Sequence, residues 1–305
     1  MLCRPRNIAF IILLFVILLL VMKPRTKLQQ SGSALQYLKT LQRESPEISN
    51  ATLGFQQIFV INLPERTDRR DALTLAAALT EIGVTWIDGI SGQQVLDKTL
   101  PSDNAGKAIS KGNKGSWRAH MNALQRIVQH NITTALILED DADWDIRLKA
   151  QLQIFAQAAK AFTQRIPGQA KQSFAQRLQA DGLKGYARDI DKLPYVVPPK
   201  ISPYGDDWDI LWLGHCGTEI PTESNSASYN TSNLKVIIPD DDTVPPPKYL
   251  KAHPFALQDE LAEMYPPNTR VVHIARSNTC TQAYAVSQQG ARRLLYQFGL
   301  QTFTT

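Results

Sequence analysis

Four carboxylate side chains lie within five residues, directly after a short run of apolar residues. The acidic segment reads Glu139-Asp140-Asp141-Ala142-Asp143 and follows Ala135-Leu136-Ile137-Leu138, a pattern typical of a buried strand. In open α/β sheets, ligands bind beyond the carboxyl ends of the strands. Such a concentration of negative charge is costly unless a cation neutralises it, and oxygen ligands suit Mg²⁺ or Mn²⁺. Asp141 and Asp143 are therefore candidate metal ligands. The alternative is a solvated acidic turn that caps a helix starting near Asp145.

The elements around this segment alternate between strands and helices. Apolar spacing predicts, in chain order, strand 58–63, helix 68–82, strand 84–90, helix 116–129 and strand 135–138. This order is typical of an α/β protein with an open mixed, mainly parallel sheet and flanking helices.

The second half of the chain continues the alternation, with longer irregular stretches. We expect further elements at helix 145–165, strand 209–213, strands 270–275 and 283–286, and helix 288–298. Residues 166–205 and 217–268 are rich in loops, and we interpret them as insertions.

The N-terminal part contains fifteen uninterrupted apolar residues, 8–22. We interpret residues 1–7 as a cytosolic tail, 8–22 as a transmembrane signal anchor and 23–54 as a polar stem, so that the domain occupies 55–305. The alternative is a cleaved signal peptide, although Lys23-Pro24-Arg25-Thr26-Lys27 follows where small residues are expected.

The net charge of +5 does not indicate a nucleic-acid-binding protein. Five of the 33 basic residues flank the apolar run, and beyond residue 27 the chain holds 28 basic and 28 acidic residues. Nucleic-acid binders concentrate basic charge on the domain that binds. We therefore expect no nucleic-acid partner.

Three N-glycosylation sequons lie downstream of the apolar run, at Asn50, Asn131 and Asn230. They favour a lumenal domain, although such tripeptides also arise by chance. In an oxidising lumen Cys216 and Cys280 could pair, or they could remain two buried thiols.

Four motifs, taken in order, resemble glycosyltransferase family 25, which includes bacterial lipooligosaccharide galactosyltransferases and collagen galactosyltransferases. The first is Val60-Ile61-Asn62-Leu63-Pro64-Glu65-Arg66-Thr67-Asp68-Arg69-Arg70, and the third is the apolar strand that ends Glu139-Asp140-Asp141. The second, Gly115-Ser116-Trp117-Arg118-Ala119-His120, has Ser for the family's Cys and Ala for its Ser. The fourth is Ala283-Tyr284-Ala285-Val286-Ser287-Gln288-Gln289-Gly290-Ala291. The resemblance covers about residues 56–300.

The resemblance implies a GT-A type nucleotide-diphospho-sugar transferase fold, a UDP-sugar donor (usually UDP-galactose), a divalent cation and inversion at the anomeric carbon. Mn²⁺ or Mg²⁺ at Asp141 and Asp143 would bridge the diphosphate oxygens. A carboxylate must deprotonate the acceptor hydroxyl, and Asp140 and Asp259 are conceivable bases. Family members usually continue with a further acidic segment past the point that corresponds to Thr305.

The resemblance also suggests donor-binding residues, which are Asn62, Arg66, Arg69, His120 and Asp141. Arginine forks match phosphate oxygens. The alternative for the arginines is a surface ion-pair patch with neighbouring acidic residues, and His120 could equally pack between helix and sheet.

We therefore expect a single-pass type II protein of the Golgi or endoplasmic reticulum membrane with a lumenal, metal-dependent glycosyltransferase domain. Its partners would be a UDP-sugar donor and a glycan or glycoprotein acceptor. One alternative is a catalytically inactive module that binds nucleotide-sugar or glycan. A third possibility, a metal-dependent phosphoester hydrolase, needs additional His ligands in motifs that the sequence does not show.

Overall fold

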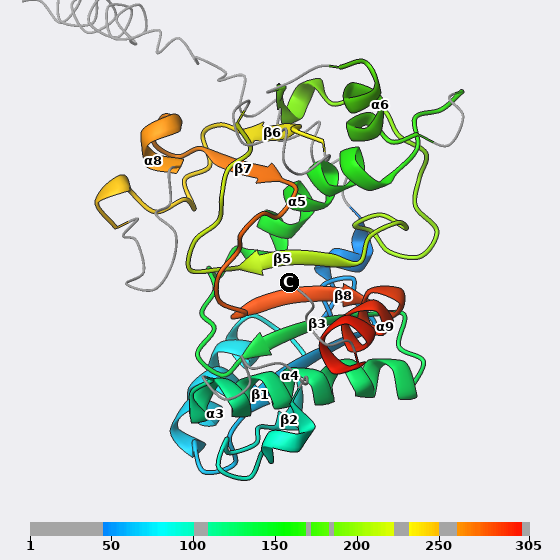
Figure 1. Ribbon diagram of the computed structural model, residues 1–305. Coiled ribbons are helices and arrows are strands. Elements are labelled where there is room, and N and C mark those ends of the chain that lie inside the picture. The colour runs from blue at the N-terminus through cyan, green and yellow to red at the C-terminus, as the bar shows by residue number, and fades with distance from the viewer. Residues whose placement is uncertain are drawn as a thin grey trace, which may run out of the picture. The chain divides into compact units, whose positions relative to one another are not determined.

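A five-stranded sheet forms the centre of the computed structural model (Figure 1). The structure describes residues 45–100, 109–168, 172–182, 186–222, 232–249 and 261–300. They belong to one compact unit, Ser45–Thr305. The five strands are β1 Gln57–Asn62, β2 Thr85–Asp88, β3 Thr134–Glu139, β5 Ile210–Gly214 and β8 Ala283–Ser287. They lie in the order β2-β1-β3-β8-β5.

The sheet is mixed, as the sequence predicted, but only two of its four strand pairings are parallel. Strand β1 is parallel to β2 and to β3, whereas β8 runs antiparallel to both β3 and β5. The carboxyl ends of β1, β2, β3 and β5 therefore lie at one edge of the sheet, and β8 begins at that same edge. This is where an α/β sheet binds ligands.

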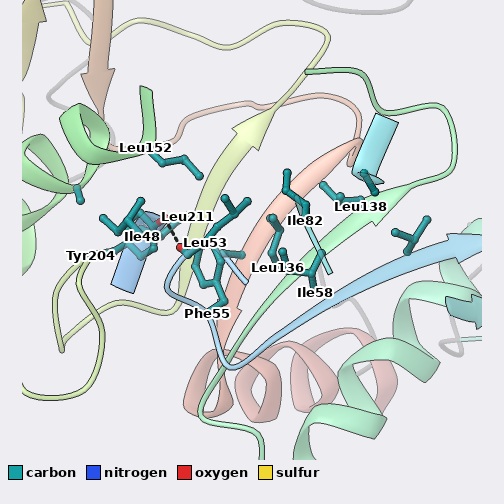
Figure 2. Packing of buried hydrophobic residues seen from close by; sticks show 14 of the residues in the cluster. Ile48, Leu53, Phe55, Ile58, Ile82, Leu136, Leu138, Leu152, Tyr204 and Leu211 are labelled. Atoms are coloured by element: carbon teal, nitrogen blue, oxygen red, sulfur yellow. Dashed lines mark hydrogen bonds between the residues drawn. The ribbon is translucent and has the colours of Figure 1, made fainter. Parts of the chain in front are cut away.

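Helices cover both faces of the sheet, because its central strands are apolar on both sides. Leu136 and Leu138 of β3 face a core shared with α3 (Thr67–Leu79) and α5 (Leu148–Thr163). Part of this core is shown in Figure 2. Ala135 and Ile137 face the opposite core, which contains α4 (Lys111–Gln129) and α9 (Gln288–Leu295).

All four predicted helices have bounds that differ from the sequence expectation. Helix α3 occupies Thr67–Leu79 rather than 68–82. Helix α4 begins at Lys111 rather than 116, because the Ser110 side chain accepts a hydrogen bond from Asn113 N (3.2 Å) and so caps it. Helix α5 occupies Leu148–Thr163, which is shorter than 145–165. Helix α9 ends at Leu295 and continues as a π-helical turn, Tyr296–Leu300.

Residues 45–54, which the sequence assigned to the stem, pack against the domain. They contain a 3₁₀ turn, Pro46–Ser49, and the side chains of Ile48 and Leu53 are buried. The Tyr204 hydroxyl donates a hydrogen bond to Leu53 O (2.6 Å). The expected anchor, 8–22, lies outside the described residues; within the described ranges, no helix combines the length and the apolar character that a membrane span requires.

The two expected insertions contribute to a second, smaller sheet. Its strands are β4 Ala187–Asp189, β6 Lys235–Ile238 and β7 Arg270–His273, in the order β4-β6-β7, with β4 parallel and β7 antiparallel to β6. The sequence predicted a strand at 270–275, which the structure shows as 270–273, but did not assign it to a separate sheet. The remaining short elements are α6 Phe174–Ala180, α8 Leu261–Met264, and the 3₁₀ turns Asp97–Thr99, Ile190–Lys192 and Pro247–Tyr249.

Candidate functional site

A cavity of about 340 Å³ opens at the carboxyl edge of the parallel strands. Its walls are the ends of β1 and β3, the loop 89–93 after β2, and the first turns of α4. Arg66, Arg69 and Lys111 contribute positive charge to the lining, and Glu139 and Asp140 contribute negative charge. One cavity therefore offers groups for both an anionic and a hydroxyl-bearing part of a ligand.

Asp140 is held by two donors on two different elements. Its Oδ2 accepts a hydrogen bond from Asn62 Nδ2 (2.8 Å), and its Oδ1 pairs with Arg69 Nη1 (2.6 Å). The same Arg69 atom lies 3.0 Å from Asp141 Oδ2. Because both oxygens of Asp140 already have partners, the structure favours an orienting contact over proton transfer for this carboxylate.

Arg66 forms a fork with Asp68 at the start of α3. Its Nε and Nη2 donate to the two carboxylate oxygens at 2.9 and 2.7 Å. The hydrogen bond from Arg66 lowers the pKa of Asp68 to about 2. This is the ion pair that the sequence gave as the alternative role of Arg66, although the residue also lines the cavity.

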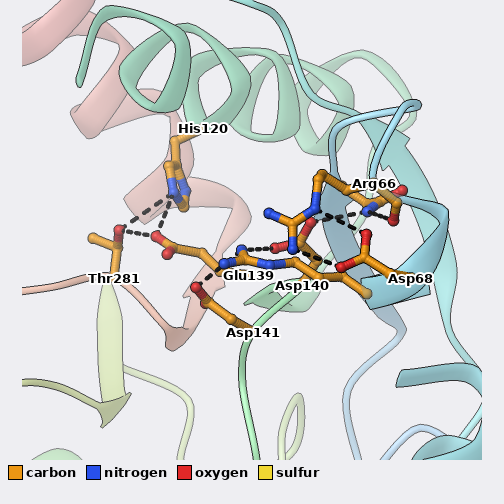
Figure 3. Close-up of polar contacts among 9 residues, drawn as sticks. Arg66, Asp68, His120, Glu139, Asp140, Asp141 and Thr281 are labelled. Carbon is orange, nitrogen blue, oxygen red and sulfur yellow. Dashed lines mark hydrogen bonds and ion pairs between the residues drawn. The ribbon is translucent and has the colours of Figure 1, made fainter. Parts of the chain in front are cut away.

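His120, Glu139, Thr281 and Tyr284 form a polar network, of which His120 and Glu139 line the cavity. His120 Nδ1 lies 3.0 Å from the Tyr284 hydroxyl, and its Nε2 lies 3.1 Å from Glu139 Oε1. Thr281 Oγ1 donates to the same Glu139 oxygen (2.5 Å). Figure 3 shows His120 and Thr281 converging on Glu139, beside Asp140 and Asp141. His120 thus packs between helix and sheet and also lines the cavity.

Glu139, Thr281 and Tyr284 were not predicted as site residues from the sequence. Glu139 and Tyr284 do belong to the third and fourth motifs, which is the signal that could have found them. Thr281 lies just before the fourth motif and carries no such signal.

Asp141 and Asp143 follow β3 but do not cap the next helix. Asp143 Oδ1 accepts from the adjacent Trp144 N (2.8 Å), whereas Asp145 Oδ1 accepts from Arg147 N (2.7 Å) just before α5. Within the described ranges, no group of three or more His, Cys, Asp or Glu side chains could hold a metal ion. Any ion at this turn would therefore take part of its coordination from a ligand or water.

The remaining residues named from the sequence divide into three groups. Cys216 and Cys280 form a disulfide with a Cα–Cα distance of 5.5 Å. Asn50 and Asn131 are exposed. Asp259 and Asn230 lie outside the described residues.

A second cavity, of about 420 Å³, lies between α5, β5 and β7. Trp212 lines it, and its Nε1 donates to Cys280 O (3.1 Å). The Trp212 ring is 6.1 Å from that of Tyr284, which in turn contacts His120. A continuous chain of side chains therefore connects the walls of the two cavities.

Comparison with known proteins supports the relation to one family. Residues 55–181 match the model of glycosyltransferase family 25 (LPS biosynthesis protein). The chain is 30% identical over 120 residues to procollagen galactosyltransferase 1 of Danio rerio, which is 36% of this chain and 20% of that protein. It is 28% identical over 119 residues to procollagen galactosyltransferase 1-A of Xenopus laevis (35% and 20%). It is 22% identical over 119 residues to inactive glycosyltransferase 25 family member 3 of Homo sapiens (35% and 20%).

The matched region spans about a fifth of the length of these relatives. It contains the first three motifs, and the structure places the strand of the fourth, β8, directly beside β3 of the third. The resemblance drawn from the motifs is therefore confirmed, in that residues 55–181 match the model of the same family.

Proposed function

We propose that the protein is a GT-A type glycosyltransferase that moves a hexose, galactose in the first instance, from a UDP-sugar to a hydroxyl of a glycan or glycoprotein with inversion. The observation that carries this proposal is the convergence of the three matched motifs on one cavity. The first motif supplies Arg66 and Arg69, the second His120, and the third Glu139 and Asp140. The names of the procollagen galactosyltransferase relatives support galactose as the sugar.

The charges of the cavity suit the two parts of a sugar nucleotide. Arg66, Arg69 and Lys111 line it with cations that match a diphosphate, and arginine does so with paired donors. In the structure Arg69 contacts Asp140 and Asp141 instead. Both contacts use Arg69 Nη1, so its Nε and Nη2 donors could bind a phosphate while these contacts remain.

We propose that a divalent cation binds at the acidic turn, with only part of its coordination supplied by the protein. Mg²⁺ and similar ions are often bound by one or two carboxylates, with substrate phosphates and water completing the shell. Asp141 and Asp143 would supply these carboxylates. The ion would offset the negative charge that develops on the departing UDP.

A second candidate function is an inactive module that binds nucleotide-sugar without transfer. A human relative named inactive supports it, as does the ion pair between Arg69 and Asp141. Both functions predict UDP-sugar binding, and they differ in turnover.

We further propose a lumenal location with residues 8–22 as a signal anchor. The Cys216–Cys280 disulfide supports an oxidising compartment. The full protein should stay in the membrane pellet after carbonate extraction, and release into the supernatant would reject the anchor.

The experiment that tests the transferase proposal measures turnover of UDP-sugars by the full chain, with and without Mn²⁺. Asp141→Asn and Asp143→Asn each remove one charged ligand while preserving size, and should lower turnover by about 10²-fold or more. Asp145→Asn is the matched control: Asp145 contacts Arg147 rather than the cavity, so the same substitution should leave turnover unchanged.

Full turnover in both the Asp141 and Asp143 variants would reject the metal assignment. A wild type that binds UDP-sugars but turns none over would support the inactive module. Thermal unfolding of each variant separates these outcomes from loss of the fold.

A further inference from the structure

Glu139 uses only one of its two carboxylate oxygens within the protein. Oε1 receives the hydrogen bond from Thr281 and faces His120 Nε2. Within the described part of the chain, Oε2 has no hydrogen-bond partner. The side chain is 28% exposed and lines the 340 Å³ cavity. Oε2 is therefore an acceptor available to a ligand.

The orientation of Glu139 is fixed by groups that need no ligand. When His120 Nε2 carries the proton and points to Glu139 Oε1, His120 Nδ1 accepts from the Tyr284 hydroxyl, so both ring nitrogens of His120 have a partner. Burial and the Glu139 charge raise the pKa of Tyr284, which keeps its proton. The Glu139 carboxylate is thus held in one orientation before a ligand binds.

The backbone next to Thr281 is held in place by contacts of the neighbouring residues. The preceding residue, Cys280, is tied to Cys216 by the disulfide, and its carbonyl accepts from Trp212 Nε1. Cys216 N donates to Thr279 O (2.9 Å). These contacts fix the Thr281 hydroxyl toward Glu139 rather than toward solvent.

The charge of the Glu139 carboxylate determines which part of a sugar nucleotide it can contact. A carboxylate repels a diphosphate, so the phosphates belong at the wall of Arg66 and Lys111. A sugar hydroxyl donates readily to a carboxylate oxygen, and charge-assisted hydrogen bonds of this kind are the stronger ones. The part of the cavity lined by Glu139 therefore suits the hexosyl group.

We propose that Glu139 contacts the transferred hexose through a hydrogen bond from a sugar hydroxyl to Oε2, and that Thr281 is a positioning residue for this carboxylate. The inference rests on the proposed function and extends it to the recognition of the donor sugar.

Binding of UDP and of UDP-hexoses tests the proposal without requiring turnover. The full chain is titrated with UDP, UDP-galactose and UDP-glucose in the presence of Mn²⁺. Glu139→Gln should lower the affinity for the UDP-hexose by about 10- to 100-fold, the range for a hydrogen bond to a charged group. It should leave the affinity for UDP unchanged. A purely structural or metal-binding role would weaken both ligands together.

Thr281 supplies the matched pair of variants. Thr281→Val preserves the shape of the side chain and loses the hydroxyl. It should therefore weaken binding of the UDP-hexose but not binding of UDP. Thr281→Ser retains the hydroxyl and should restore wild-type binding. Melting temperatures of the two variants verify that the fold is intact.

The outcomes distinguish failure of the proposed function from failure of the Glu139 contact. A wild type that binds neither UDP nor a UDP-hexose rejects the proposed function and the inference with it. A wild type that binds both, with Glu139→Gln weakening them equally or not at all, overturns the inference alone.

Discussion

Gly115 lies in the second turn of α4, where the helix contacts the loop that follows β2. A Cβ atom at Gly115 would lie 2.4 Å from Ile90 O and 2.9 Å from Gly92 N. At Gly112, three residues earlier on the same helix, the nearest atom would be Ser110 Oγ at 4.0 Å. Both glycines line the cavity, but only Gly115 lacks space for a methyl group.

We expect Gly115→Ala to be less stable than Gly112→Ala by about 1 to 3 kcal/mol, the usual cost of overpacking. Each substitution gains up to about 1 kcal/mol from helix propensity, so this gain largely cancels in the comparison. Ordinary contact begins at 3.4 Å, so the loop must retreat from Gly115→Ala by about 1 Å. In a unit of this size, each kcal/mol lowers the melting temperature by about 2 to 4 °C.

The same displacement should affect the cavity. A shift of about 1 Å in a positioning segment can lower turnover by about 10²-fold, and the loop 89–93 forms one wall of the site. Thermal melts, UDP titration and UDP-galactose turnover of the two variants provide the measurements. Equal stability and activity of Gly115→Ala and Gly112→Ala would refute the close packing of this loop on α4.

Three further predictions concern parts of the structure outside the cavity. Replacing Cys216 and Cys280 by Ser should lower the free energy of unfolding by about 2 to 4 kcal/mol in denaturant titrations, and an unchanged midpoint would contradict the disulfide. Tyr204→Phe leaves the buried Leu53 carbonyl without its donor and should cost about 1 to 3 kcal/mol without altering UDP binding, which a melt and a titration measure together. Asn50 is exposed, and its Oδ1 accepts from two groups of its own sequon, so a lumenal protein should carry a glycan there; mass spectrometry of Asn50→Gln should show the loss of that mass.

The central strands were predictable because their signals are local. Residues 58–63 and 135–138 are compact apolar runs with polar or proline ends, and the structure contains β1 and β3 there. The start of α4 was missed because Gly112 and Gly115 read as loop residues. Their role is visible only when the loop that packs against the helix is known.

The small sheet could not be predicted because its strands are short and come from distant segments. Strand β4 contains only Ala187–Asp189, and its partner β6 begins at Lys235. Such runs have no distinctive period, and sequence alone does not set their register. The polar network at the candidate site could not be predicted for the same reason, because Thr281 and Glu139 are 142 residues apart in the sequence.

The direction of β8 brings the second half of the chain to the carboxyl edge of the sheet. Because β8 is antiparallel to β3 and pairs Ala283 with Leu138, it begins where β3 ends. The residues before β8 therefore lie beside the acidic turn, and Thr281 meets Glu139 there. A parallel strand in the same position would begin at the opposite edge and leave Glu139 without this donor. The candidate site consequently includes a contact from beyond residue 181, outside the matched region, and under the proposed function the second half of the fold would help to orient the donor sugar.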